Sequence, residues 1–213
     1  MANIIYIMGK SSTGKDTIYN LLKGKIDVNT YILYTTRPKR EGEENAKDYY
    51  FITEEQFKKL KEQGKVIEYR SYNVVNSEGK PDIWTYATID DNQWKAKGDF
   101  LTIGTLESYN SILLFLKTHP ERNLNILPVY ILIDEEERKT RAIKREGKEK
   151  KPNLKEIARR FAADNIDFSD ENLRKAGITK EETFENYNLE ECIGKILNYI
   201  KIKTSKVENK KNL

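Results

Sequence analysis

The chain has 213 residues, 38% of them hydrophobic and 34% charged, with a formal net charge of +4. These values are typical of one charge-rich α/β domain with small insertions, and so small a positive excess does not indicate nucleic acid as a partner. No stretch reaches the roughly 20 apolar residues that a membrane span needs. Cys192 is the only cysteine, which excludes an intrachain disulfide, and the N-terminus lacks the pattern of a signal peptide. We therefore expect a cytoplasmic protein with no membrane partner.

Short apolar runs and amphipathic stretches follow one another along the chain. Strands are expected at residues 4–8, 31–36, 66–72, 84–89, 100–103, 126–133 and 183–187. Helices are expected at residues 17–23, 53–63, around 112–116, 135–146, from 152 onward and 189–202. Thr53 and Gln56 have the spacing of a capping box at the start of the second of these helices. Strands that alternate with helices predict a parallel sheet covered on both faces.

One segment breaks this alternation. Residues 37–90 hold a charged loop, a helix and two strands in succession, which predicts a small β-rich insertion that forms a second lobe. The core would then consist of residues 1–36 and 91–203. Residues 204–213 are polar and rich in lysine, and we expect them to be a disordered tail.

The first expected strand leads into a loop that two glycines bracket, and a helix follows. The residues of this loop that we expect to bind phosphate are Gly9, Ser11, Ser12, Thr13, Gly14, Lys15, Asp16 and Thr17. The backbone N–H groups of such a loop and the helix N-terminus favour a phosphate, and a lysine at this position reaches the outer phosphates of a nucleotide. Asp16 departs from the phosphate-loop pattern, which has Ser or Thr at this position. The alternative is a glycine turn before an ordinary helix, with Lys15 in solvent.

A second pattern carries a family resemblance. Residues 35–43 read T-T-R-P-K-R-E-G-E, and residues 47–51 read K-D-Y-Y-F. This long pattern resembles the acceptor-binding segment of the guanylate kinase family, and the resemblance continues through most of the chain. It implies a P-loop NTPase-type parallel sheet flanked by helices, with an NMP-binding insertion at 37–90 and a helical lid at about 136–163. Arginine forks also suit a monophosphate on chemical grounds, because it carries about two negative charges. The alternative for this stretch is a solvated charged loop.

The resemblance implies which residues bind the acceptor nucleotide. They are Thr36, Arg37, Arg40, Glu43, Tyr49, Glu68, Tyr86 and Thr88. Glu68 can accept from N1–H and the exocyclic amine of guanine, and Thr88 can donate to O6. Two base-reading positions of the family differ, since Leu33 replaces a serine and Gly104 replaces an aspartate. We therefore expect guanine to be preferred but read less strictly than in the family.

Arginines also recur in the expected lid. Arg138, Arg141 and Arg145 are three and four residues apart, which places them on one helical face. The resemblance implies that Arg141, Arg145 and Arg160 act with Lys15 on ATP and the transferring phosphoryl group, and that residues 147–151 form the lid tip. Arg138 better fits the alternative of a surface helix with ordinary ion pairs.

Magnesium needs a different site from that of the family. The resemblance places carboxylates that serve magnesium and guanine at two positions where this chain has Thr102 and Gly104. Mg²⁺ binds proteins through one or two carboxylates and keeps several waters. We therefore expect Mg²⁺ at Asp16 and Thr17, directly or through water.

These observations predict a kinase that transfers the γ-phosphoryl group of ATP to GMP or dGMP, with Mg²⁺ as cofactor and without a nucleic-acid partner. Two alternatives stay open. One is a kinase for a different nucleoside monophosphate. The other is a non-catalytic module that binds a phosphorylated partner through Arg37, Arg40 and Tyr49.

Overall fold

The computed structural model describes residues 2–75, 80–146 and 154–209. The chain forms two compact units, of which unit 1 holds residues 1–29, 98–110 and 123–213, and unit 2 holds residues 30–97 and 111–122. Unit 2 thus extends beyond the insertion expected at 37–90. The expected lid tip at 147–151 lies outside the described residues. No helix of the described residues is long and apolar enough to cross a membrane.

Unit 1 is built on a five-stranded sheet with the order β2-β7-β1-β8-β9. Its strands are β1 (Ala2–Gly9), β2 (Asn29–Thr30), β7 (Phe100–Gly104), β8 (Leu124–Leu132) and β9 (Thr183–Glu185). β1 pairs in parallel with β7 and β8, and β8 pairs in parallel with β9. This confirms the predicted parallel sheet. β1 lies in the middle and ends at Gly9, so the loop that follows starts at the carboxyl edge of the sheet, where ligands of such sheets bind.

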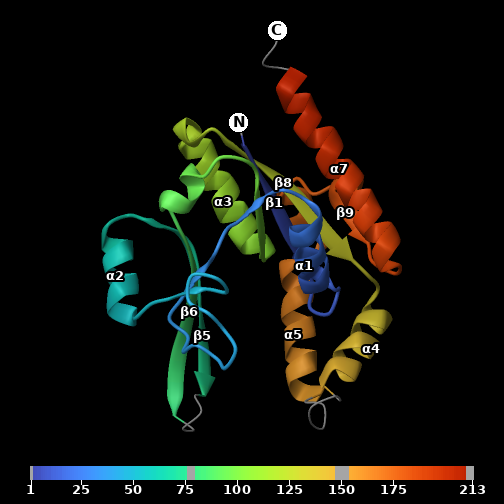
Figure 1. The fold of residues 1–213 in the computed structure, drawn as a ribbon. Coiled ribbons are helices and arrows are strands. Elements are labelled where there is room, and N and C mark those ends of the chain that lie inside the picture. Colours follow the sequence, from blue (N-terminus) through green and yellow to red (C-terminus); the bar gives the residue numbers. More distant parts are fainter. Residues whose placement is uncertain (1, 76–79, 147–153, 210–213) are drawn as a thin grey trace. The chain divides into compact units, whose positions relative to one another are not determined.

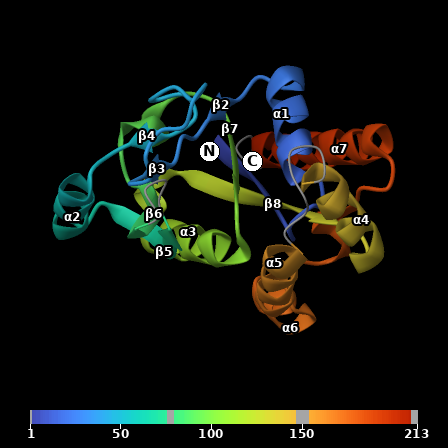
Figure 2. The ribbon, with the colours of Figure 1, turned by 90° about the horizontal axis from the view of Figure 1, so that it is seen from below.

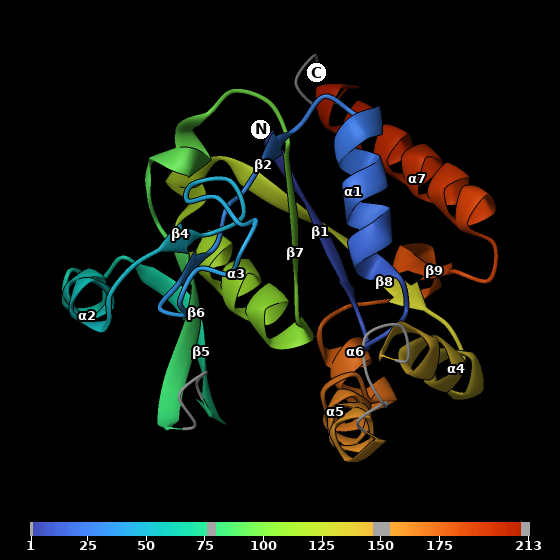
Figure 3. The ribbon, with the colours of Figure 1, turned by 60° about the horizontal axis from the view of Figure 1, so that its bottom comes forward.

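Helices α1 (Lys15–Lys25) and α7 (Leu189–Asn209) cover one face of this sheet (Figure 3). Ile5 and Ile7 of β1 are buried against Ile18 of α1 and Ile196 of α7. Cys192 lies in the same core, where burial raises the pKa of its thiol to about 11. Because side chains alternate along a strand, the neighbouring residues of β1 face the other side of the sheet.

That other face is covered in part by aromatic residues. Tyr6 of β1 packs against Tyr109 of α3 (Leu106–Thr118), with ring centroids 5.6 Å apart. Its hydroxyl donates to the carbonyl of Thr105 at 3.1 Å. A Cβ atom on Gly104, at the end of β7, would collide with the Tyr6 hydroxyl. The phenol of Tyr6 therefore fills the space in which an aspartate at position 104 would begin.

The expected lid is helical on both sides of residues 147–153. It consists of α4 (Glu135–Glu146) and α5 (Leu154–Asp167), which lie next to each other in Figure 2 and share a small apolar core of Ala142, Ile157 and Phe161. A short helix that the sequence did not predict, α6 (Asp170–Lys175), follows, and Ser169 is its N-cap, with a side chain that accepts from the backbone N–H of Asn172. Phe168, between α5 and α6, stacks on Tyr130 of β8 and anchors this region to the sheet.

Unit 2 holds a four-stranded sheet in the order β4-β3-β6-β5, helix α2 (Glu54–Glu62) and the part of α3 from residue 111 onward. Figure 1 labels α2, β5 and β6 of this unit. The strands are β3 (Tyr34–Thr35), β4 (Tyr50–Phe51), β5 (Val66–Val75) and β6 (Pro81–Ile89), and two 3₁₀ turns span Asn92–Lys95 and Pro120–Arg122. β5 and β6 form an antiparallel pair. α2 starts with the predicted capping box of Thr53 and Gln56, and its Phe57 packs on Ala87 and Ile89 of β6.

Two expectations differ from the structure. Residues 31–36 form only the two-residue strand β3, because the side-chain amide of Gln93 binds the backbone N–H and carbonyl of Ile32 in place of a neighbouring strand. The tail also differs, since α7 continues to Asn209 and residues 204–209 are helical rather than disordered. Lys203 of α7 binds Glu181 and Glu182 of a third 3₁₀ turn (Lys180–Glu182), which holds the helix just before this stretch.

Gly104→Ala should destabilise the protein, because the phenol of Tyr6 has to move or tilt. Overpacking of this kind costs about 1–3 kcal/mol, which corresponds to a fall in Tm of about 3–10 °C for a chain of this size. Gly24→Ala in α1 is the matched control, because a Cβ there meets no atom within 4 Å. It should leave the Tm unchanged or raise it slightly. Calorimetry of both variants makes the test, and equal Tm values for both would contradict the packing at Gly104.

Candidate functional site

The loop between β1 and α1 is shaped by its two glycines. A Cβ on Gly9 would lie 2.7 Å from the carbonyl oxygen of Ile131 and 2.9 Å from Thr13 Oγ1, so only glycine fits there. Gly14 caps α1 with φ at +89°, in the left-handed region that favours glycine. Its Cβ would also collide with the side chain of Asn186. The two glycines therefore form the close backbone turn that a phosphate loop requires.

The backbone of the loop is held by a distant side chain of unit 1 and by a hydrogen bond within the loop. Asn186 donates from Nδ2 to the carbonyl of Thr13 at 2.8 Å, and Thr13 Oγ1 donates to the carbonyl of Lys10 at 2.9 Å. Ser12 has φ at +65°, and its Oγ is buried without a hydrogen-bond partner among the described residues. A buried hydroxyl without a partner is costly. Ser12 is therefore a candidate ligand-binding group of the loop.

Arg138 corrects one expectation. The sequence suggested a surface arginine, but its side chain is 1% exposed, beneath the loop. Its Nε donates to the carbonyl of Ser11 at 2.9 Å, and its Nη2 donates to Asp164 of α5 at 2.6 Å. Asp164 also accepts from the backbone N–H of Ser11 at 2.8 Å, and the guanidinium lies over the ring of Phe161. Arg138 thus joins α4 and α5 to the phosphate loop.

A pocket of about 460 Å³ opens beside the loop. Six predicted residues line it, namely Ser12, Gly14, Asp16, Thr17, Arg141 and Arg145. Arg141 is oriented by two contacts, from Nε to Glu137 at 2.8 Å and from Nη2 to the carbonyl of Asn186 at 2.9 Å. Arg160, on α5, is half-buried and is not among the residues that line this pocket. Asn186 and Tyr187, which no sequence motif indicated, line it as well.

The first residues of α1 carry the charges nearest to the loop. Lys15 is partly buried, with Nζ 3.6 Å from a carboxylate oxygen of Asp16, and Asp16 and Thr17 are exposed. No group of three or more Asp, Glu, His or Cys side chains among the described residues is placed to hold a metal. One exposed carboxylate beside a hydroxyl suits Mg²⁺ that arrives with a nucleotide and keeps its waters, rather than a resident ion.

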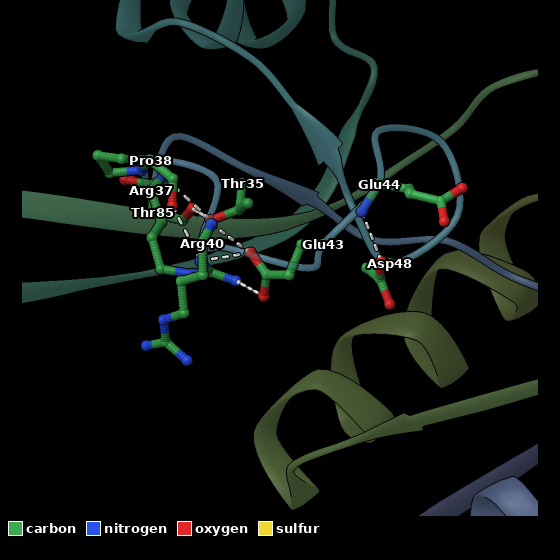
Figure 4. A network of polar contacts seen from close by, with 8 residues as sticks. All are labelled: Thr35, Arg37, Pro38, Arg40, Glu43, Glu44, Asp48 and Thr85. Carbon is green, nitrogen blue, oxygen red and sulfur yellow. Dashed lines mark hydrogen bonds and ion pairs between the residues drawn. The ribbon is translucent and has the colours of Figure 1, made fainter.

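In unit 2, the predicted acceptor residues are organised around Glu43 (Figure 4). Arg37 is 3% exposed and makes a bidentate pair with Glu43, with N···O distances of 2.9 and 2.7 Å. Arg37 also donates to the carbonyl of Pro38, and the backbone N–H of Arg40 donates to Glu43 at 2.8 Å. The Arg37 guanidinium lowers the pKa of Glu43 to about 2. The side chain of Arg40 points away from this network.

The aromatic residues of the predicted site surround the same guanidinium. Arg37 lies over the ring of Tyr49 at 5.3 Å, and Tyr49 meets Tyr86 edge to face at 5.8 Å. Arg37 Nε is buried without a partner among the described residues. Thr36 stabilises the backbone of the sheet. Its Oγ1 accepts from the N–H of Thr85 at 2.9 Å, and its own N–H donates to the carbonyl of Thr85 at 2.9 Å.

The two predicted base readers contact each other directly. Glu68 of β5 lies opposite Thr88 of β6, and Thr88 Oγ1 donates to Glu68 Oε1 at 2.7 Å. Glu68 also pairs with an arginine outside the predicted site residues, with Arg70 Nε 3.5 Å from Glu68 Oε2. The period of two along a strand places Arg70 on the same face as Glu68, and this signal was available in the sequence.

Glu43→Gln should destabilise the protein at neutral pH by about 2–4 kcal/mol, because Arg37 stays buried without its partner. The Glu43 carboxylate has a folded pKa of about 2, below its ordinary value of 4.5. Its contribution is therefore complete above about pH 4.5 and disappears as the pH falls toward 2. Urea unfolding between pH 7 and pH 2 should show the difference between wild type and variant shrinking over this window.

Glu44→Gln is the control for this experiment, because its pair with Lys47 is exposed and worth little. If the difference in free energy of unfolding between wild type and Glu43→Gln does not change with pH, the ionised pair is contradicted.

Comparisons with known proteins agree with the geometry of both units. A family model described as guanylate kinase matches residues 1–187. Guanylate kinase from Malacoplasma penetrans is 39% identical over 92 residues, which are 42% of this chain and 46% of that protein. Guanylate kinase from Thermotoga maritima is 42% identical over 67 residues, or 31% of this chain and 32% of that protein. These alignments span less than half the length of the curated relatives.

The crystal structure of guanylate kinase from Anaplasma phagocytophilum has a TM-score of 0.57 to this chain at 18% sequence identity. The superposition covers 95% of this chain and 86% of that one, and it shows a shared fold. Since the family model spans residues 1–187 of the 213, the chain belongs to the guanylate kinase family.

Proposed function

We propose that the chain transfers the γ-phosphoryl group of ATP to a nucleoside monophosphate, with GMP or dGMP as the preferred acceptor, and releases ADP and GDP or dGDP. The observation that carries this proposal is the loop from Gly9 to Lys15, where the backbone is compatible only with glycine at two positions and a pocket with two arginines opens beside it. Membership in the guanylate kinase family supports the same reaction.

The donor nucleotide would be bound by unit 1. The loop N–H groups, the N-terminus of α1 and Ser12 would hold its phosphates, and Lys15 would reach the outer ones. Arg141 and Arg145 line the pocket, and with Arg160 they would stabilise the charge that spreads over the phosphoryl oxygens in the transition state. Mg²⁺, held beside Asp16 and Thr17 together with the nucleotide, would neutralise phosphate charge.

The acceptor would be bound by unit 2. Arg37 is already paired with Glu43, so the two charges cancel, and its Nε–H is a donor that has no partner among the described residues. Arg40 is exposed, and Glu43 fixes its backbone, so Arg40 would supply most of the attraction for the phosphate dianion. Tyr49 would contribute its hydroxyl, and Glu68 would accept from N1–H and the amine of guanine.

Lys15→Ala tests the reaction. It should lower kcat by about 10²- to 10³-fold, because Lys15 stabilises charge that develops in the transition state. ADP formation from ATP and GMP in a coupled assay is the measurement. Lys23→Ala, an exposed lysine on the same helix, is the control and should match wild type. If GMP and the other monophosphates produce no ADP above background with the wild-type protein, the kinase proposal fails and a binding module is the better description.

Arg40→Ala tests the acceptor site. It should raise the KM for the monophosphate by about 10- to 100-fold, since each charge-assisted hydrogen bond contributes about 1.5–3 kcal/mol. The KM for ATP should stay within about threefold. Lys39→Ala removes an exposed charge next to it and serves as the control. Equal losses for both substrates in Arg40→Ala would refute the assignment of Arg40 to the acceptor.

A further inference from the structure

The hydroxyl proton of Thr88 is already used in a hydrogen bond within unit 2. Thr88 is 1% exposed and Glu68 is 8% exposed, and the Thr88 hydroxyl donates to Glu68 Oε1 at 2.7 Å. A hydroxyl has one proton to donate. Thr88 therefore cannot donate to guanine O6 while it holds Glu68, as the sequence analysis expected it to do. Its role is to orient the carboxylate, and a carbonyl of the base needs another donor.

Arg70 is placed to be that donor. It lies two residues from Glu68 on β5, so both side chains are on the same face of the sheet. Across the ladder, Glu68 pairs with Thr88 and Arg70 pairs with Tyr86. Arg70 Nε is 3.5 Å from Glu68 Oε2, and the two side chains are 15% and 6% exposed. Arg70 and Tyr86 thus form the cross-strand pair next to the Glu68–Thr88 pair.

The chemistry of the Glu68–Arg70 pair selects one arrangement of groups on a ligand. A carboxylate accepts hydrogen bonds and a guanidinium donates them, so the pair fits a base on which an N–H lies beside a carbonyl. Guanine and hypoxanthine have this order, with N1–H next to O6. Adenine has the opposite order, with the acceptor N1 next to an amine, and would place like groups opposite each other. Arginine bound to guanine O6 and N7 is also a common contact in nucleic-acid recognition.

We propose that Arg70 is a specificity-determining residue that donates to O6 of a 6-oxopurine monophosphate while Glu68 accepts from N1–H. This inference rests on the proposed function for the reaction that follows binding, but the selectivity can be measured without it. Burying an arginine and a glutamate together seldom stabilises a fold by itself, which favours a role in recognition for this pair.

The experiment measures binding of GMP, IMP, AMP and UMP by calorimetry in the absence of ATP. Arg70→Met keeps much of the length of the side chain and removes its charge. This variant should weaken the affinity for GMP and IMP by about 10- to 100-fold and change the affinity for AMP by less than about threefold. Arg122→Met is the matched control, because Arg122 is also partly buried and paired with a carboxylate, Asp90, in the same unit. It should leave the ranking of the four nucleotides unchanged.

Further variants distinguish recognition from loss of structure. Arg70→Lys keeps a charged donor and should recover part of the preference for GMP over AMP, and Arg70→Gln replaces Arg70→Met if that variant does not fold. The inference is overturned if Arg70→Met lowers the affinity for GMP and AMP by the same factor, or if this variant binds GMP with the affinity of wild type. It is also overturned if wild type binds UMP more tightly than GMP. UMP is included because uracil also carries an N–H beside a carbonyl on a smaller ring.

Turnover is measured in parallel, so that the two proposals can fail separately. If wild type binds GMP selectively through Arg70 but forms no ADP, the kinase proposal fails and the assignment of Arg70 stands. If GMP is phosphorylated and Arg70→Met keeps the wild-type ratio of kcat/KM for GMP and AMP, the kinase proposal stands and the assignment of Arg70 fails.

Discussion

The burial of the Arg138 guanidinium beneath the phosphate loop is the constraint on which the rest of unit 1's site depends. A buried charge is stable only when it is paired and hydrogen-bonded, and Arg138 meets this condition through Ser11 and Asp164. Asp164 in turn accepts from the N–H of Ser11, so both polar backbone groups of one loop residue are bound by side chains from α4 and α5. The conformation of the loop and the position of the two lid helices are therefore set by the same group of atoms.

Much of the fold could be predicted from local patterns. The apolar runs located the long strands of unit 1, and the Thr53–Gln56 spacing located the start of α2. The two predictions that were wrong have physical causes. Residues 31–36 looked like a strand because they are rich in apolar and β-branched side chains, but the backbone of Ile32 is bound by the side chain of Gln93, 61 residues away in the sequence. The tail looked too polar to be ordered, and its helix depends on preceding turns packed on the core and on the contacts of Lys203.

The candidate site could be predicted from the sequence where its residues form contiguous motifs. The phosphate loop and the segment around Arg37 are such motifs, and the structure places their residues together within each unit. Asn186 and Asp164 bind the loop from positions 173 and 153 residues away in the sequence, so no local pattern could indicate them. Arg138 was misjudged for the same reason, because its burial depends on Phe161 and Asp164, which belong to another helix.

The single thiol of the chain, Cys192, can be used to measure the local stability of unit 1. Cys192 lies in the core of unit 1, between α7 and the sheet, and its raised pKa keeps it protonated at neutral pH. Only a thiolate exposed to solvent reacts with an alkylating reagent. Since unit 2 contains no cysteine, the rate of alkylation follows the opening of unit 1 alone. The local stability of unit 1 can thus be separated from that of unit 2 in the intact chain, without adding a label.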